Sequence, residues 1–275
     1  GLNSYYQVEN WEYQASFTSD NTPWFFNGLR VQIFPTKKLK LEAWIINGWQ
    51  SYGKFNSMPG LGGNITWCPN EAVKILTNDY YGTDAAGLKN RIRFHSDNSL
   101  LVRYYNQPKA KGISRAAFST TFDLGFESGD GVRGFNGNDE TPSQYFLSGM
   151  VYNRIWFNNN IFAWTIGGGY MTNPGRYLVL YPTGDASPLP NPNNPTQTAG
   201  THPFSANPGD EFKGWDCSTN FDWMPNQSIT FRVEFVHREA NVPYFAGSGG
   251  VTSPTGYSTT PLPADWNPDF VKMEH

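Results

Sequence analysis

Apolar and polar residues alternate along most of the chain, which is the pattern of β-strands. In residues 114–126, the even positions include Phe118 and Phe122, whereas the odd positions include Arg115 and Asp123. Such a strand has one apolar face and one face that is small or charged. The spacing of three and four residues that predicts amphipathic helices is not sustained anywhere in the sequence.

The alternation predicts ten strands. They are residues 29–33, 39–46, 60–67, 73–78, 91–105, 114–126, 145–156, 161–171, 213–223 and 229–235. Residues 5–17 have a broken alternation and give only weak support for an eleventh. The count of ten requires residues 91–105 to form one long strand instead of a hairpin.

The connections between these strands alternate strictly between short turns and long loops. The short turns are residues 35–37, 69–71, 107–112, 158–160 and 225–227, and the long loops are residues 47–59, 79–90, 127–143, 172–210 and 239 onward. All short turns would then lie at one end of an up-and-down sheet, as in outer-membrane barrels. A soluble sandwich has mixed loop lengths and Greek-key returns.

The sequence therefore predicts an all-β, antiparallel, up-and-down transmembrane β-barrel. We expect one domain over residues 1–275 with at least ten strands. The barrel formed by this chain can be incomplete at one or both ends. Residues 172–210 form a loop with seven prolines. A loop of this length is usually functional or disordered. Two alternatives stay open: it folds into or over the pore and narrows it, or it is an extracellular loop with a β-ribbon.

Aromatic residues gather at both ends of the predicted strands. Those beside the long loops are Trp24, Phe25, Phe26, Trp49, Tyr80, Tyr81, Phe126, Tyr145, Phe146 and Tyr170, and those beside the short turns are Trp67, Tyr104, Tyr105, Trp156, Phe157 and Trp223. Two such belts are typical of the two membrane interfaces. The alternative is that aromatic residues simply end strands over a soluble core.

Composition narrows the function classes. The net charge is −3, so the chain lacks the basic excess of a dedicated nucleic-acid binder. An aromatic content of 16% argues against global disorder. Cys68 and Cys217 give neither a disulfide framework nor a metal pattern, and the strand phases put them on opposite faces.

Several short stretches look familiar. They are Phe26-Asn27-Gly28-Leu29-Arg30-Val31, Ile46-Asn47-Gly48-Trp49, Gly62-Gly63-Asn64-Ile65-Thr66-Trp67 and Arg238-Glu239-Ala240. Together they resemble the OmpL-like β-barrel porin family over roughly residues 24–250. The resemblance implies a channel in the outer membrane of Gram-negative bacteria, without catalytic residues or a defined ligand. The chain departs from the usual pattern because it ends on Lys272-Met273-Glu274-His275 and not on a strand with a terminal aromatic. We expect the closing strand to be missing.

Candidate chemistry other than transport has weak support. Glu42, Asp216, Asp222 and Glu234 could be paired carboxylates for glycoside hydrolysis, but the strand phases put all four on the polar face with other solvated charges. The four histidines are scattered and lack ligand spacing. Gly167-Gly168-Gly169 lacks the lysine and helix of a phosphate loop and indicates close backbone approach within a strand. We expect no catalytic residues, metal or cofactor.

The strand phases assign two sets of residues. The expected pore-lining residues are Arg30, Lys40, Glu42, Lys74, Arg91, Arg93, Arg103, Arg115, Asp123, Arg154, Asp216, Asp222, Arg232 and Glu234. The expected lipid-facing residues are Leu41, Phe118, Phe122, Trp215, Phe221 and Phe231. With Asp97 included, basic residues outnumber acidic ones on the polar phase, so the pore would either prefer anions or have its charges cancelled by pairing.

The leading hypothesis is an outer-membrane porin that passes small hydrophilic solutes by passive diffusion and is not an enzyme. Its partners would be outer-membrane lipid and those solutes, without nucleic acid, and a homo-oligomer or surface assembly is left open. The first alternative is a secreted β-sandwich that binds or cleaves carbohydrate. The second is a barrel that acts as a scaffold for a surface assembly.

Overall fold

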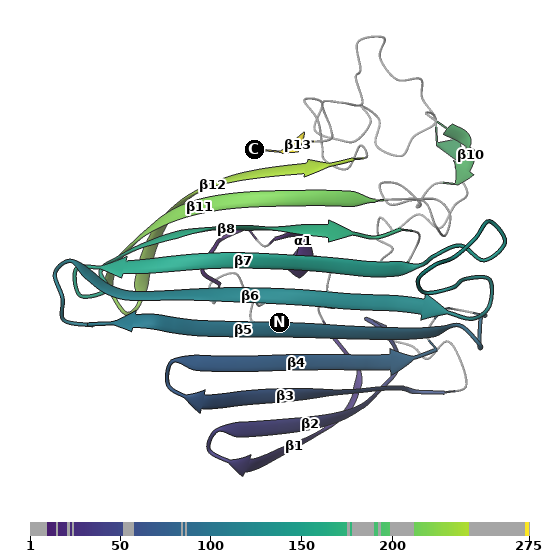
Figure 1. The fold of residues 1–275 in the computed structure, drawn as a ribbon, viewed down its shortest axis with the longest axis horizontal. Helices are drawn as coiled ribbons and strands as arrows, with labels where there is room; N and C mark the ends of the chain where they lie inside the picture. The colour runs from purple at the N-terminus through teal and green to yellow at the C-terminus, as the bar shows by residue number, and fades with distance from the viewer. Residues whose placement is uncertain are drawn as a thin grey trace, which may run out of the picture.

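The structure is a computed structural model dominated by one large antiparallel β-sheet. It describes residues 10–14, 16–20, 23, 25–51, 58–83, 85, 87–174, 177, 190–191, 194–198, 212–241 and 273–274. Figure 1 shows the strands side by side in chain order, with the sheet bending away from its central strands at both edges. Helix is limited to the single turn α1 (Phe17–Asp20) within the described residues.

Ten long strands make up the sheet. They are β1 (Gly28–Thr36), β2 (Leu39–Ile46), β3 (Gly60–Asn70), β4 (Val73–Gly82), β5 (Ile92–Asn106), β6 (Ile113–Ser128), β7 (Tyr145–Phe157), β8 (Phe162–Thr172), β11 (Lys213–Asn226) and β12 (Ile229–Ala240). Each overlaps one predicted strand, so the all-β, up-and-down prediction is confirmed. β5 is a single strand of 15 residues, as the count of ten required.

Three further strands are very short. β9 (Pro190–Asn191) and β10 (Asn194–Thr198) pair with each other in a separate two-stranded sheet. In the large sheet, β8 is therefore followed by β11, with which it pairs. β13 (Met273–Glu274) pairs with the last residues of β12. Among the described residues no pairing joins β1 to β12 or β13, so the sheet is open there. The described part of residues 5–17 contains no strand.

The predicted alternation of short and long connections is also present. β1–β2, β3–β4 and β11–β12 are joined by two residues each, whereas β6–β7 and β8–β11 are joined by long segments. In the β7–β8 turn, Asn158, Asn159 and Asn160 have φ of 50°, 57° and 65°. Asparagine tolerates this left-handed region better than other side chains, which explains the run of three.

The two faces of the sheet have an unusual distribution of burial. On β6, Asp123 is fully buried although it lies on the charged face, whereas its neighbour Phe122 is 49% exposed on the apolar face. The polar face of β5–β8, β11 and β12 is covered, and the apolar face is open. A soluble sandwich would bury the apolar faces of its sheets against each other.

Several aromatic residues expected in interface belts instead lie on the polar face. Tyr80 and Phe146 are buried there beside His95, and Trp156 lies over Arg154. Successive residues of a strand point to opposite faces of the sheet. These aromatic residues occupy the same alternate positions as the charged residues, so they lie on the polar face. Aromatic residues on the apolar face remain exposed at both strand ends, for example Tyr170 and Trp223. Trp24 lies outside the described residues.

The glycine run in β8 allows close approach, as the sequence indicated. A Cβ on Gly167 would collide with the Tyr152 ring of β7 and with the Val151 carbonyl oxygen. Because Tyr152 is buried, its ring has little room to move away. The two cysteines are free, with Cys68 at the end of β3 and Cys217 exposed on β11.

We expect Gly167→Val to lower the free energy of unfolding by about 1–3 kcal/mol, because overpacking forces side chains from their rotamers. Gly112→Ala is the matched control, since a Cβ at Gly112 meets nothing within 4 Å. Urea titration of the refolded protein measures both. Equal midpoints for the two variants would contradict the packing of Tyr152 on Gly167.

Candidate functional site

The candidate site is the polar face of the sheet, which holds the residues predicted to line a pore. Residues paired across neighbouring strands point to the same face. By that register all of the predicted pore-lining residues except Arg91 lie on one face. Arg91 precedes β5, and its guanidinium lies 4.0 Å from Glu127 of the same face.

Near the short turns, three charged side chains from three strands form a buried cluster. Asp222 accepts hydrogen bonds from Arg154 at 2.6 Å and from Arg232 at 2.6 and 2.7 Å. Arg154 also donates to the Thr165 hydroxyl at 2.8 Å. The carboxylate therefore compensates two guanidinium groups at once, which stabilises both in a buried position.

Glu42 of β2 forms a second polar cluster. Its carboxylate accepts hydrogen bonds from Gln32 at 2.6 Å, from Lys40 at 2.8 Å and from the Trp44 indole at 2.8 Å. Arg30 lies 4.0 Å from the same carboxylate and keeps 61% of its side chain exposed. Arg30 is thus held only weakly by Glu42 and extends into solvent.

Near the long loops, the polar face carries a mixed ionic and aromatic cluster. Arg93 is paired with Glu127 at 2.7 Å, and Glu127 also accepts from Gln144. His95 Nε2 lies 3.6 Å from Asp123, and His95 Nδ1 lies 2.8 Å from the Tyr177 hydroxyl. Arg93 and Glu127 thus compensate each other, and His95 lies between the Asp123 carboxylate and the Tyr177 hydroxyl.

Aromatic rings surround that cluster. Tyr177 stacks on His95 and Phe146 at 5.9 and 6.1 Å between ring centroids, and the Arg93 guanidinium lies 4.5 Å from the Tyr177 ring. Trp49 lies 4.6 Å from His95. Tyr177 belongs to the long predicted loop, so part of that loop folds onto the polar face.

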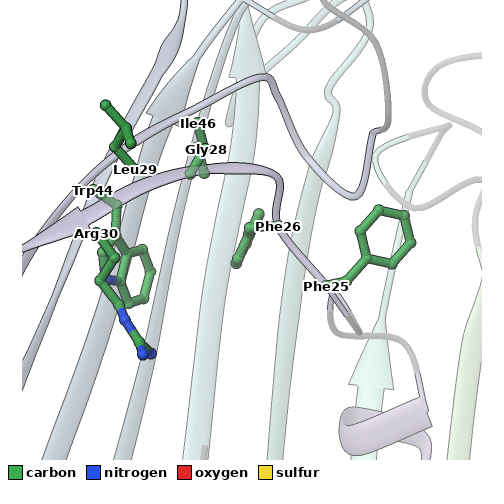
Figure 2. A pocket seen from close by; sticks show the side chains of 7 residues that line it. All are labelled: Phe25, Phe26, Gly28, Leu29, Arg30, Trp44 and Ile46. Atoms are coloured by element: carbon green, nitrogen blue, oxygen red, sulfur yellow. The ribbon is translucent and has the colours of Figure 1, made fainter.

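A cavity of about 420 Å³ opens at the unpaired edge of the sheet, beside β1. Figure 2 shows Arg30 and Trp44 extending in the same direction from the paired strands β1 and β2, while Leu29 points away from them. The Phe26 ring lies 5.8 Å from Trp44. A guanidinium beside two aromatic rings lines this cavity.

The predicted lipid-facing residues lie on the opposite, apolar face. Phe122, Trp215, Phe221 and Phe231 are exposed, and Leu41 and Phe118 are half-buried on the same face. Over β5–β8, β11 and β12 the sheet thus separates an exposed apolar surface from a covered charged one.

A comparison with models of known protein families identifies the family of this chain. The family model described as "Putative beta-barrel porin-2, OmpL-like" matches residues 1–260. The chain belongs to this OmpL-like porin family. No curated protein and no solved structure matched it.

Membership of the OmpL-like porin family places the protein in the bacterial outer membrane and gives it the role of a β-barrel channel protein. Proteins of porin families are generally not enzymes. In the part of the chain that the structure describes, no helix is long and apolar enough to cross a membrane.

The carboxylates considered for glycoside hydrolysis are engaged in this porin's own structure. Asp222 is held by two arginines, Glu42 by three donors, and Asp216 by the backbone amide of Phe17 at 2.6 Å. Glu234 accepts two backbone amides. Over the described ranges, no group of three His, Cys, Asp or Glu side chains is arranged to hold a metal ion.

Sequence reasoning missed several residues of the polar face. Glu127 and Arg238 were left out because the predicted strands ended before them, although both continue the phase of their strands. Tyr177 and the residues before β1 carry no periodic signal that would assign them to this face. Only the folded sheet brings them there.

We expect Asp222→Asn to lower the free energy of unfolding by about 3–5 kcal/mol, because two buried arginines lose their shared counter-charge. Chemical denaturation of the refolded protein measures the change. The control is Glu71→Gln, which removes the carboxylate 3.8 Å from Arg103. The Glu71 side chain is 97% exposed, so its loss should cost less than about 1 kcal/mol. Similar losses for both variants would contradict the buried ion triad.

Proposed function

We propose that this protein passes small hydrophilic solutes across the bacterial outer membrane by passive diffusion. The observation that carries the proposal is the inverted sheet, with charged residues on the covered face and large apolar residues on the exposed face. In a membrane barrel the apolar face contacts lipid and the polar face borders an aqueous channel. No chemical step takes place, so selectivity depends on pore width, lining charge and the loops at the mouth.

The strand lengths support this function. A tilted strand needs about 9–11 residues to cross a membrane, and β3–β8, β11 and β12 have 10 to 16. Pairing within the sheet satisfies the backbone polar groups that lipid cannot. A secreted sandwich would not expose Phe122, Phe221 and Phe231 together. A scaffold without transport would share the fold, so a transport measurement must separate it from a channel.

The direct test is a liposome swelling assay with sugars and amino acids of increasing size. The proposal predicts that swelling rates fall as solute mass rises. Protein that is inserted, shown by heat-modifiable migration on a gel, but gives no swelling with any solute would overturn the channel and favour the scaffold.

Phe122→Arg should reduce insertion into lipid vesicles. Phe122 is exposed near the middle of β6, and an arginine facing lipid at the bilayer centre costs about 2–4 kcal/mol. Phe122→Leu keeps an apolar side chain and serves as the control. Folding yields in vesicles, read from heat-modifiable migration, compare the variants. If Phe122→Arg inserts as well as the wild type, the apolar face does not contact lipid.

We also expect a modest preference for anions. Arg93 is paired with Glu127, and Arg154 and Arg232 share the buried carboxylate of Asp222. In the described part of the chain, Arg115 lies over the Trp156 ring, and the ion-pair partner of Arg103 is the exposed Glu71. These two arginines flank one short turn and so lie near the same mouth. Uncompensated positive charge raises the local anion concentration, less so at high salt.

Reversal potentials across a KCl gradient measure this preference. Arg103→Ala combined with Arg115→Ala should move the reversal potential toward that of an unselective pore. The control removes two exposed charges in long loops, Lys89→Ala and Arg133→Ala, and should leave the reversal potential unchanged. A cation preference in the wild type, or no shift in the first variant, would refute the proposal.

A further inference from the structure

Two described stretches before β1, residues 10–14 and 16–20, lie on the polar face of the sheet. We call residues 10–14 and 16–20 the inner segment. Its helical turn α1 contacts β7, β8 and β11, and Figure 1 shows α1 behind β7 and β8. The segment therefore lies on the side of the sheet that holds the charged residues.

Side chains of the sheet bind the main chain of the inner segment. The carbonyl oxygen of Trp11 accepts hydrogen bonds from Asn220 at 2.7 Å, Arg154 at 3.1 Å and Thr165 at 3.3 Å. Three strands thus converge on one carbonyl group. Buried main chain outside regular structure needs such partners, because an unpaired polar group is costly.

Carboxylates of the sheet bind the amides that follow. Asp216 accepts from the Phe17 amide at 2.6 Å. Glu234 accepts from Tyr13 at 2.5 Å and from Gln14 at 3.1 Å. Hydrogen bonds from backbone N–H groups to ionised carboxylates are stronger than those between neutral groups. Donors and acceptors of the polar face are therefore arranged to match this segment.

Side chains of the inner segment add apolar anchors. Phe17 is fully buried against Phe212, under the Arg238 guanidinium at 5.5 Å from the ring. Trp11 meets Trp156 edge to face at 5.7 Å between ring centroids. The Ser16 hydroxyl lies 2.8 Å from the Met150 sulfur. Anchors at both ends hold the segment along the sheet.

We propose that the inner segment is a constriction built into the channel, held by the polar faces of β7, β8, β11 and β12. This inference rests on the proposed channel function and names what narrows the pore. In such a channel, one side of the pore wall is formed by charged residues that contact the inner segment or its binding partners. They are Arg154, Asp216, Asp222, Arg232 and Glu234. The segment therefore lies directly on this side of the wall. Solutes then pass over the remaining wall, and release of the segment widens the path.

Position is tested first, by crosslinking in a background with Cys68→Ser and Cys217→Ser. The side chains of Ser16 and Met150 are in contact. In the double variant Ser16→Cys/Met150→Cys, dibromobimane should therefore link the two cysteines of protein inserted in vesicles. The control is Ser16→Cys with Val151→Cys. Val151 is the next residue of β7 but is exposed on the opposite face, so it should not be linked.

Single-channel conductance tests the effect. Replacing residues 10–20 by a glycine–serine linker should raise conductance by about twofold or more, because pore width governs flow. Asn220→Ala removes one anchor of Trp11 and should raise conductance in the same direction. Its control is Asn64→Ala, a buried asparagine that donates to the Thr77 carbonyl within the sheet at 3.2 Å. The crosslinked protein should keep the low conductance.

Each outcome decides the proposal. Two results together support the constriction. The Ser16→Cys/Met150→Cys pair is crosslinked whereas the Val151→Cys control is not, and conductance rises in the linker and Asn220→Ala variants but not in Asn64→Ala. Absence of that crosslink, or equal crosslinking of the Val151→Cys control, refutes the position. A crosslink with unchanged conductance in the linker variant refutes the constriction but leaves the channel. No conductance in any inserted variant, including the linker variant, overturns both the channel and the constriction.

Discussion

The two-residue period of the strands is the constraint on which the rest of this structure depends. It sorts side chains onto two faces while the backbone groups pair between neighbouring strands. In register, the sorting extends across ten strands, so charged groups far apart in sequence meet on one face. A shift of one residue in any strand would reverse its two faces and place its charges on the apolar surface.

The charged face is stable because its groups compensate one another. Asp222 lies against Arg154 and Arg232, and Glu127 lies against Arg93. Removing one partner of such a pair leaves an uncompensated buried charge. The same pairing explains why these carboxylates are poorly suited to acid–base chemistry. They serve as structural partners of the arginines.

Segments outside the strands complete this face. Tyr177 packs from the long loop against His95 and Phe146, and Phe17 packs from the inner segment against Phe212. Tyr177, Phe146, Phe17 and Phe212 form one apolar cluster with Met171 and Ala240. The polar face is therefore crossed by an apolar cluster near the long loops.

The sequence by itself determined the strands, their order and their two faces. Local alternation and turn chemistry are written in neighbouring residues, as in β6 and in the Asn158–Asn160 turn. It also resembled the porin family that the family model then identified. It could not assign Tyr80, Phe146 and Trp156 to the correct surface, because aromatic residues suit either a belt or a packed cluster. Which arginines are neutralised, and where Tyr177 and residues 10–20 lie, was decided only by tertiary structure. The contacts of Arg93 with Tyr177 and of Phe17 with Asp216 join residues 84 and 199 positions apart, and no local periodicity encodes them.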